Sequence, residues 1–526
     1  MPSFRILPWL TVITLAACSS HPSHDAQPAG QSAAGAPTSA SAPASASAAL
    51  SASASTESQR LADALRLIAD KQFEAGLAAL RSVIDARSFA RLPSIDQYHA
   101  LLVAGEAEMG FHRWPLARGY LLRAAAMPQV TADDLLALLT LGSQQHDDTL
   151  IAESLTIVAK KWPDRLGDID EDFLTRVLGA QAKLPRATAL ALLQSLYAAN
   201  FKLKWGFEPS ESWRDLMLLL IERGRPSEAA GVSARITDPL VILEIRADRR
   251  FDAVVAAHPL SFDAEAAADR QIKWLQAKDE GGADSLRVKV LLMAALMRRN
   301  HAPAALAIAD DAIADIRDTN YPERRFVDYL AEYGDLLTER AFALLDLGLW
   351  DEGVAQLKEA AREFEHDRDN IEAAIDLAAV ECDLARPADA QSALAQITAG
   401  LSPYGQMRVE GVRLDAATQS GDTAQVERSL SYLRAHRGEA PMSYLSGLII
   451  ANQLDRAGEE LRRQLLAPDT RPSALGNVQT FAPEQATPRD LEMRARWQSL
   501  LARPGVQQAI AKVGRVQSYD MEGSPF

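Results

Sequence analysis

Cysteine is nearly absent from this sequence. Only Cys18 and Cys382 occur among 526 residues. Neither stands in a C-x-x-C pair or beside a cluster of histidines. A disulfide framework is therefore excluded, and a cysteine-based zinc or redox site is not indicated.

Positive charge, aromatic residues and β-type alternation are also scarce. The chain carries 55 Lys and Arg against 70 Asp and Glu, which gives a formal net charge of −15. Binding to phosphates needs a basic surface, so we expect no nucleic-acid partner. Aromatic residues make up 6% of the chain, and runs that alternate with period two are rare, so an α/β domain is not expected.

Motifs that would indicate catalysis are missing. The sequence has no H-E-x-x-H, no Walker A loop, no G-x-S-x-G and no G-x-G-x-x-G after a strand. The densest candidate metal cluster is His146-Asp147-Asp148, which we interpret as a solvated loop. Carboxylate pairs such as Asp310-Asp311 are interpreted as solubility features of exposed helix faces. We therefore predict no catalytic residues, no metal, no cofactor and no enzymatic activity.

The N-terminus has the pattern of an export signal. One positive charge at Arg5 precedes an apolar segment from Ile6 to Leu15, which is too short to span a bilayer. The segment ends in Leu15-Ala16-Ala17-Cys18, which resembles the lipobox of bacterial lipoproteins. An ordinary secretory signal, in which Cys18 has no special role, is the alternative.

The lipobox resemblance implies a membrane anchor. Residues 1–17 would be the signal peptide, cut immediately before Cys18, and Cys18 would then carry the acyl chains (palmitate among them). Several acyl chains give stable attachment where one gives only reversible binding. Ser19 follows the cysteine where inner-membrane retention signals usually carry Asp, so the resemblance implies a protein on the outer membrane that faces the periplasm.

Residues 18–58 have a composition that cannot form a core. They are almost entirely Ala, Ser, Pro, Gly, Gln and Thr, with one Leu and no aromatic residue after Cys18. Such a segment cannot bury enough apolar surface to offset its conformational entropy. We predict a disordered tether over residues 18–58.

From residue 59 onward the apolar residues follow a helical period. Leu61, Leu65 and Ile68 form one stripe, and a second begins at Leu77 after a turn near Lys71. The sequence therefore predicts an all-α fold.

Small residues recur at a nearly constant distance within this helical region. Gly348 and Gly353 are followed by Ala385 and Ala390, and then by Gly421 with Val426; the spacing is 37 and then 36 residues. This pattern resembles the tetratricopeptide repeat, including proteobacterial lipoproteins of that kind, and implies an α-solenoid of antiparallel helix pairs over residues 59–465. An irregular helical bundle or another α-solenoid is the alternative. We expect Gly348 and Gly353 to lie at close helix contacts.

Two segments depart from the repeat. "FKLKWGFEPSESW", around Trp205, predicts a break between two stacks of helices. Residues 466–526 begin with a Pro- and Thr-rich loop and continue into two helices, which we interpret as a terminal cap.

Stacked helix pairs create a long concave surface, and proteins of this kind usually bind their partners on that surface. We therefore expect a scaffold whose concave groove binds a protein or peptide partner in envelope assembly, secretion or cell-wall maintenance. The alternative is an envelope enzyme, or its activator, acting on peptidoglycan or exported polysaccharide. Tryptophans of the folded part would serve in core packing or as anchors in the groove; they are Trp114, Trp162, Trp205, Trp213, Trp274, Trp350 and Trp497.

Overall fold

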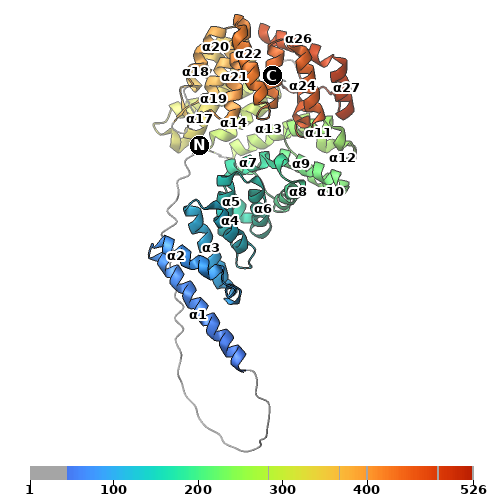
Figure 1. Cartoon of the computed structure of the whole chain (residues 1–526). Helices are drawn as coiled ribbons and strands as arrows, with labels where there is room; N and C mark the ends of the chain where they lie inside the picture. The colour runs from blue at the N-terminus through green and yellow to red at the C-terminus, as the bar shows by residue number, and fades with distance from the viewer. Residues whose placement is uncertain (1–43, 282–283, 366–367, 398–400, 483–484, 524–526) are drawn as a thin grey trace, which may run out of the picture. The chain divides into compact units, whose positions relative to one another are not determined.

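The structure is a computed structural model that describes residues 44–281, 284–365, 368–397, 401–482 and 485–523. It is almost entirely helical and divides into two compact units, Met1–Asn200 and Phe201–Phe526 (Figure 1). The division falls at the break predicted around Trp205, whose backbone lies in the left-handed region at φ 64°. Cys18 and the predicted signal peptide lie outside the described residues.

The first unit consists of paired helices joined by short turns. Its helices are α1 (Ala44–Ala69), α2 (Phe73–Ile84), α3 (Ser94–Gly110), α4 (Trp114–Ala125), α5 (Ala132–Gln145), α6 (Asp148–Lys161), α7 (Glu171–Gly179) and α8 (Arg186–Ala198). Helix α1 begins at Ala44, so residues 44–58 of the predicted tether are helical. Alanine is the best helix former, and the alanines of this stretch continue directly into an amphipathic segment that packs on α2.

The second unit contains the remaining helices. They are α9 (Ser210–Glu222), α10 (Pro226–Ser233), α11 (Pro239–Ala247), α12 (Asp252–Ala257), α13 (Ala264–Glu280), α14 (Leu286–Met297), α15 (Ala302–Arg317), α16 (Pro322–Arg325), α17 (Tyr329–Asp346), α18 (Trp350–Ala360), α19 (Ile371–Asp383), α20 (Pro387–Leu394), α21 (Pro403–Ser420), α22 (Thr423–Ala435), α23 (Pro441–Ile450), α24 (Leu454–Leu466), α25 (Arg471–Asn477), α26 (Pro488–Leu501) and α27 (Pro504–Val513). Two short strands, β1 (Phe364–Glu365) and β2 (Arg368–Asp369), pair antiparallel between α18 and α19. The predicted all-α array of antiparallel, tetratricopeptide-like helix pairs is confirmed.

One turn geometry joins the paired helices in both units. A single residue in the left-handed region, with φ between 53° and 73°, ends the first helix of each pair; these residues are Lys71, His112, His146, Gly224, Asn300, Gly348, Ala385, Gly421 and Asn452. The next residue donates its N–H to a carbonyl five positions earlier, as Leu349 does to Leu344 at 3.0 Å. This is the Schellman arrangement, which satisfies carbonyls left free at a helix end.

The predicted small residues lie where the paired helices cross. Five positions after the turn residue, the second helix carries a buried Gly or Ala in most pairs. A Cβ on Gly353 would come within 2.7 Å of Leu345, so this glycine permits close approach of α17 and α18 as predicted. At the equivalent position α6 carries Ile151, and the glycine is supplied instead by α5 as Gly142, whose Cβ would come within 2.7 Å of Ile151.

The expectation for Gly348 was wrong. A Cβ on Gly348 would meet nothing nearer than Trp350, at 4.0 Å, so the residue is not at a close helix contact. Its φ of +73° is the reason for glycine at this position, because residues with a Cβ are strained there.

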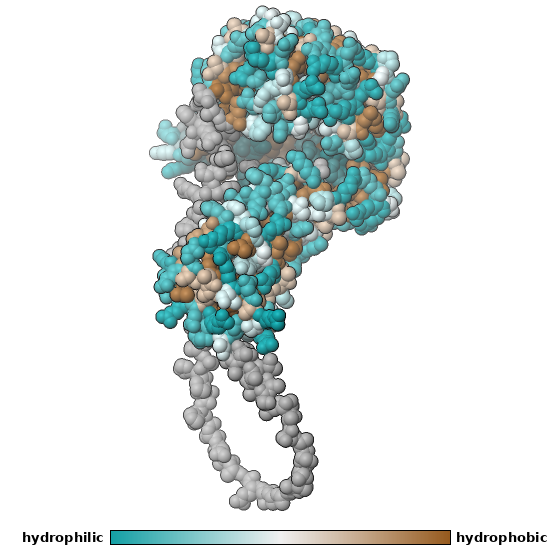
Figure 2. Space-filling model, viewed as in Figure 1, coloured by the Kyte–Doolittle hydropathy of each residue, from teal (hydrophilic) through white to brown (hydrophobic). Residues whose placement is uncertain are grey.

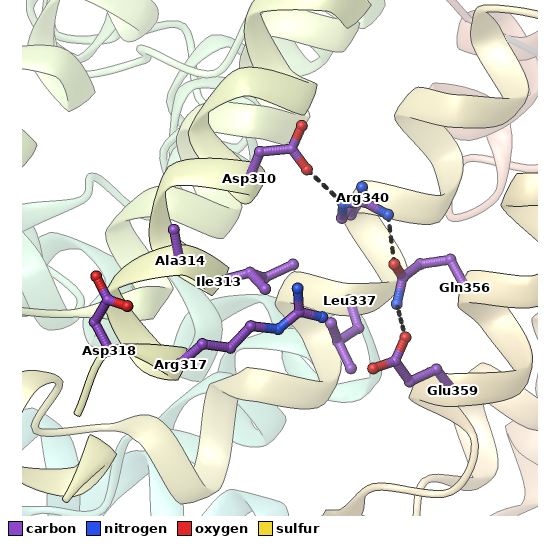
Figure 3. Close-up of a pocket in the computed structure, with 9 residues that line it drawn as sticks. All are labelled: Asp310, Ile313, Ala314, Arg317, Asp318, Leu337, Arg340, Gln356 and Glu359. Carbon is purple, nitrogen blue, oxygen red and sulfur yellow. Dashed lines mark hydrogen bonds and ion pairs between the residues drawn. The ribbon is translucent and has the colours of Figure 1, made fainter. Parts of the chain in front are cut away.

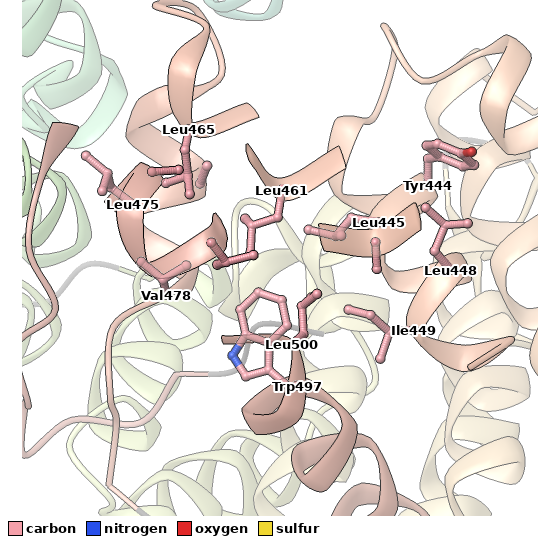
Figure 4. Packing of buried hydrophobic residues seen from close by; sticks show 14 of the residues in the cluster. Tyr444, Leu445, Leu448, Ile449, Leu461, Leu465, Leu475, Val478, Trp497 and Leu500 are labelled. Atoms are coloured by element: carbon pink, nitrogen blue, oxygen red, sulfur yellow. The ribbon is translucent and has the colours of Figure 1, made fainter. Parts of the chain in front are cut away.

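The second unit closes on itself. Helix α25 packs against α11, and the Arg515 N–H donates to the Ala247 carbonyl at 3.0 Å. One apolar cluster therefore contains Ala247 together with side chains of α21 to α27, and Figure 4 shows Leu461, Leu475 and Trp497 among its members. Residues 466–526 do not form a simple cap with one face in water, because they join the end of the array to its beginning.

No helix among the described residues is long and apolar enough to cross a membrane. The face seen in Figure 2 is mainly hydrophilic, with hydrophobic side chains in small separate areas.

Candidate functional site

The inner face of the second unit is built from the first helix of successive pairs. Helices α14, α17, α19, α21 and α23 pack on one another in that order, whereas α15, α18, α20 and α22 pack chiefly on the first helices beside them. Since the first helices lie closer together, they form the inner side of the curved array.

Carboxylates line one part of this inner face. Glu332, Asp335 and Glu339 of α17 have the spacing i, i+3, i+7, and Glu372 and Asp376 of α19 have the spacing i, i+4. Each set therefore lies on one side of its helix. We term these five residues the acidic strip.

Two arginines from neighbouring helices hold the acidic strip in place. Arg287 of α14 pairs with Glu332 at 3.3 Å and with Asp335 at 3.5 Å. Arg408 of α21 forms ion pairs with both carboxylates that α19 contributes. Four of the five carboxylates pair with these two guanidinium groups, and the charge of Arg298 also acts on Glu339, so the strip still has more carboxyls than arginines. The side chains of Asp335 and Glu372 are 41% and 56% exposed, which makes this part of the strip accessible.

Burial and mutual repulsion raise the pKa values of the strip. The pKa of Glu339 is raised to about 7, first by burial and then by the charges of Asp335 and Asp376. Burial also raises the pKa of Asp376, and the Arg408 guanidinium opposes that rise. Glu339 makes no hydrogen bond or ion pair with any described residue. Such a surface favours a cationic group, which would restore the charged form of these carboxyls.

The remainder of the inner face is covered by the chain itself. Helix α26 packs on α19 and α23, and its Arg489 forms a buried ion pair with Asp415 of α21. The pKa of Asp383 is raised to about 8, first by burial and then by the charges of Asp490 and Asp415. Residues of α26 therefore occupy part of the inner face.

A polar cavity of about 600 Å³ lies between α15, α17 and α18 (Figure 3). Arg340 bridges two of its walls, with its Nε 2.8 Å from Asp310 and its Nη1 donating to Gln356 at 2.5 Å. Gln356 donates in turn to Glu359 at 3.0 Å. Asp310 is therefore part of a network between helix pairs, and not only a solubility feature. Because these polar groups satisfy one another, we interpret the cavity as an interhelical cleft.

The other residues singled out in the sequence are structural where they are described. His146 ends α5 in the left-handed region, and Asp147 caps α6 and pairs with Arg118. Within the described ranges no group of three or more His, Cys, Asp or Glu could hold a metal ion. Trp213 and Trp497 are buried in the core, and the other five described tryptophans are partly buried.

The sequence prediction missed the acidic strip. The sequence shows that the carboxylates share one face of α17 and one face of α19. It does not show that these faces turn inward.

Comparisons with known proteins give only weak likenesses. No protein-family model matches the chain, and no curated protein matches it. Among solved structures, a Rap protein complexed with competence and sporulation factor is 12% identical, with 79% of this chain and 99% of that chain covered and a TM-score of 0.33. Yeast Tom70 is 10% identical, with 87% and 99% covered and a TM-score of 0.24. No function is inferred from these likenesses.

Proposed function

We propose that this protein is a scaffold that binds a protein or peptide partner in envelope assembly, secretion or cell-wall maintenance. In this proposal Cys18 carries a lipid that holds the chain at the outer membrane, facing the periplasm. The observation that carries the binding role is the accessible acidic strip on the inner face of a stacked helical array. Arrays of this kind present extended surfaces on which contacts with a partner are distributed.

The charge of the strip defines the partner segment. Its carboxylates outnumber the arginines that contact them, so a segment rich in Lys or Arg would complement it. The net charge of −15 would attract such a segment over long range at low salt. A basic segment that binds here would also lower the pKa of Glu339 by favouring its ionised form.

Charge reversal with a matched control tests this binding site. The double variant Asp335→Lys/Glu372→Lys inverts the exposed part of the strip. The control Asp351→Lys/Glu352→Lys makes the same change in net charge on the exposed side of α18. We expect the first variant to bind a fluorescent Lys/Arg-rich peptide at least tenfold more weakly than wild type in anisotropy titrations. The control should stay within twofold, and equal losses in both would show that only overall charge matters.

A single-residue variant separates the scaffold from the enzyme alternative. A surface that spreads its contacts should tolerate Glu339→Gln, so an envelope-integrity assay should show little change. Loss of function in this variant, with folding and peptide binding intact, would instead identify Glu339 as a catalytic carboxyl.

Cell fractionation tests the anchor. Cys18→Ala should leave the outer-membrane fraction for the soluble or unprocessed pool, because the acyl chains provide the attachment. Cys382→Ala is the matched control and should fractionate as wild type. Unchanged fractionation of Cys18→Ala would contradict the lipoprotein proposal.

A further inference from the structure

Residues 515–519 form an extended segment that pairs with a neighbouring stretch of backbone, and the chain bends at Asp520 and Met521. The Thr480 N–H donates to the Gln517 carbonyl at 3.0 Å, and the Tyr519 N–H donates back to the Thr480 carbonyl at 2.9 Å. The two stretches run parallel. Pairing of this kind is the way in which proteins bind extended peptides by strand addition.

Helix ends receive three further contacts of this segment's backbone. The Glu522 N–H donates to the carbonyl of Arg298, just beyond α14, at 2.8 Å. The Asp520 N–H donates to the Glu265 carboxylate in the first turn of α13, also at 2.8 Å. The Arg299 guanidinium donates to the Asp520 carbonyl. All three contacts use the backbone of the segment, so they do not depend on its sequence.

Two side chains of the segment are buried. Met521 has no exposed surface and Tyr519 is only 9% exposed. The ring of Tyr519 lies 6.3 Å from that of Phe481, measured between centroids. Both side chains are therefore buried against the rest of the second unit, with a bend in the chain at Asp520 and Met521.

We propose that the surface formed by residues 480–482 with the ends of α13 and α14 is a peptide-recognition groove, occupied in this structure by the chain's own residues 515–523. The partner that fits it is an extended segment of another protein with an aromatic residue and, two positions later, a methionine. This groove contains none of the five residues of the acidic strip, but it adjoins them: the charge of Arg298 acts on Glu339, and Glu522 hydrogen-bonds to Asp346 of α17.

The attached segment competes with any external one. An intramolecular ligand acts at an effective concentration in the millimolar range, which hides the groove from a dilute peptide. Weakening the attached segment should therefore expose the groove. The substitution Met521→Asp does this, because a carboxylate cannot be buried at that position without a partner.

A labelled peptide of residues 515–523 tests the groove on the full chain. We expect it to bind Met521→Asp at least tenfold more tightly than wild type, and the peptide that carries Asp in place of Met521 should bind neither protein. A second variant, which lacks residues 515–526, should also bind the peptide. The Lys/Arg-rich peptide should bind both variants as it binds wild type, which separates this test from that of the acidic strip.

Three results would overturn the proposal. One is a folded Met521→Asp or truncated chain that binds no peptide. Another is wild type that binds the peptide as tightly as the variants do. The third is loss of the helical circular dichroism signal in both variants, which would show that residues 515–523 are an integral part of the core and not an exchangeable occupant.

Discussion

The turn residue Ala385 should be a weak point among the left-handed turn positions that join the helix pairs. Its φ is +56°, whereas the equivalent residues in the adjacent pairs are Gly348 and Gly421, both at +73°. A residue with a Cβ costs about 1–2 kcal/mol in this region. Glycine avoids that cost but loses about 0.4–1 kcal/mol through its greater freedom in the unfolded chain. Ala385→Gly should therefore raise the free energy of unfolding by about 0.5–1 kcal/mol.

The reverse substitution should have the opposite sign. Gly421→Ala should lower the free energy of unfolding by a similar amount, since a Cβ there would meet nothing within 4 Å and only the backbone is strained. Gly411→Ala is the matched control, because Gly411 lies within α21 and also has open space around it. This control should stabilise by about 0.5–1 kcal/mol, as alanine does in a helix interior.

Equilibrium unfolding in urea, followed by circular dichroism at 222 nm, measures all three effects. The two units can unfold separately, so midpoints and slopes should be compared for the transition that the substitutions shift. A lower midpoint for Ala385→Gly would refute the backbone reasoning, as would a higher one for Gly421→Ala. Either result would mean that the turn is not held in the left-handed region.

Three further changes test packing and electrostatics. Gly353→Leu should destabilise by about 1–3 kcal/mol through overpacking, whereas Gly411→Leu should not; equal melting of both would contradict the close contact. Glu339→Gln should stabilise at pH 8 by on the order of 1–3 kcal/mol and have little effect at pH 4. The folded carboxyl has a raised pKa of about 7, so wild type loses stability as pH rises from about 4.5 to about 7. An effect independent of pH would exclude this cause. Glu381→Ala should lower the free energy of unfolding by about 1–2 kcal/mol, and Asp351→Ala should lower it by less than about 0.5 kcal/mol, as measured by thermal or urea unfolding. A larger loss for Asp351→Ala than for Glu381→Ala would contradict this prediction.

The Glu381 prediction rests on an ion network that repeats between pairs. Its side chain, 1% exposed, lies 3.2 Å from Lys358 of the preceding pair and 3.7 Å from Arg386. Arg386 also pairs with Asp351, which is largely exposed, so removing that partner leaves no buried charge unpaired. The first unit has the same network in Glu108, Arg81, Arg113 and Glu74.

The sequence alone determined the local features of this protein. The helical period, the turns between paired helices and the small residue five positions after most turns depend on contacts close in sequence, and they appear as patterns that can be read directly. The spacing of the carboxylates on α17 and α19 belongs to the same class. For this reason the all-α repeat frame around Gly353 and Ala390 was predicted correctly.

Tertiary structure decided which surfaces remain open. The contact of Ala247 with Arg515 and the ion pair of Arg489 with Asp415 join residues far apart in the chain. No periodicity encodes such pairings, because they depend on how small rotations accumulate along the whole stack. The closure of the second unit, the covering of part of its inner face by α26 and the inward turn of the acidic strip all follow from that accumulated geometry.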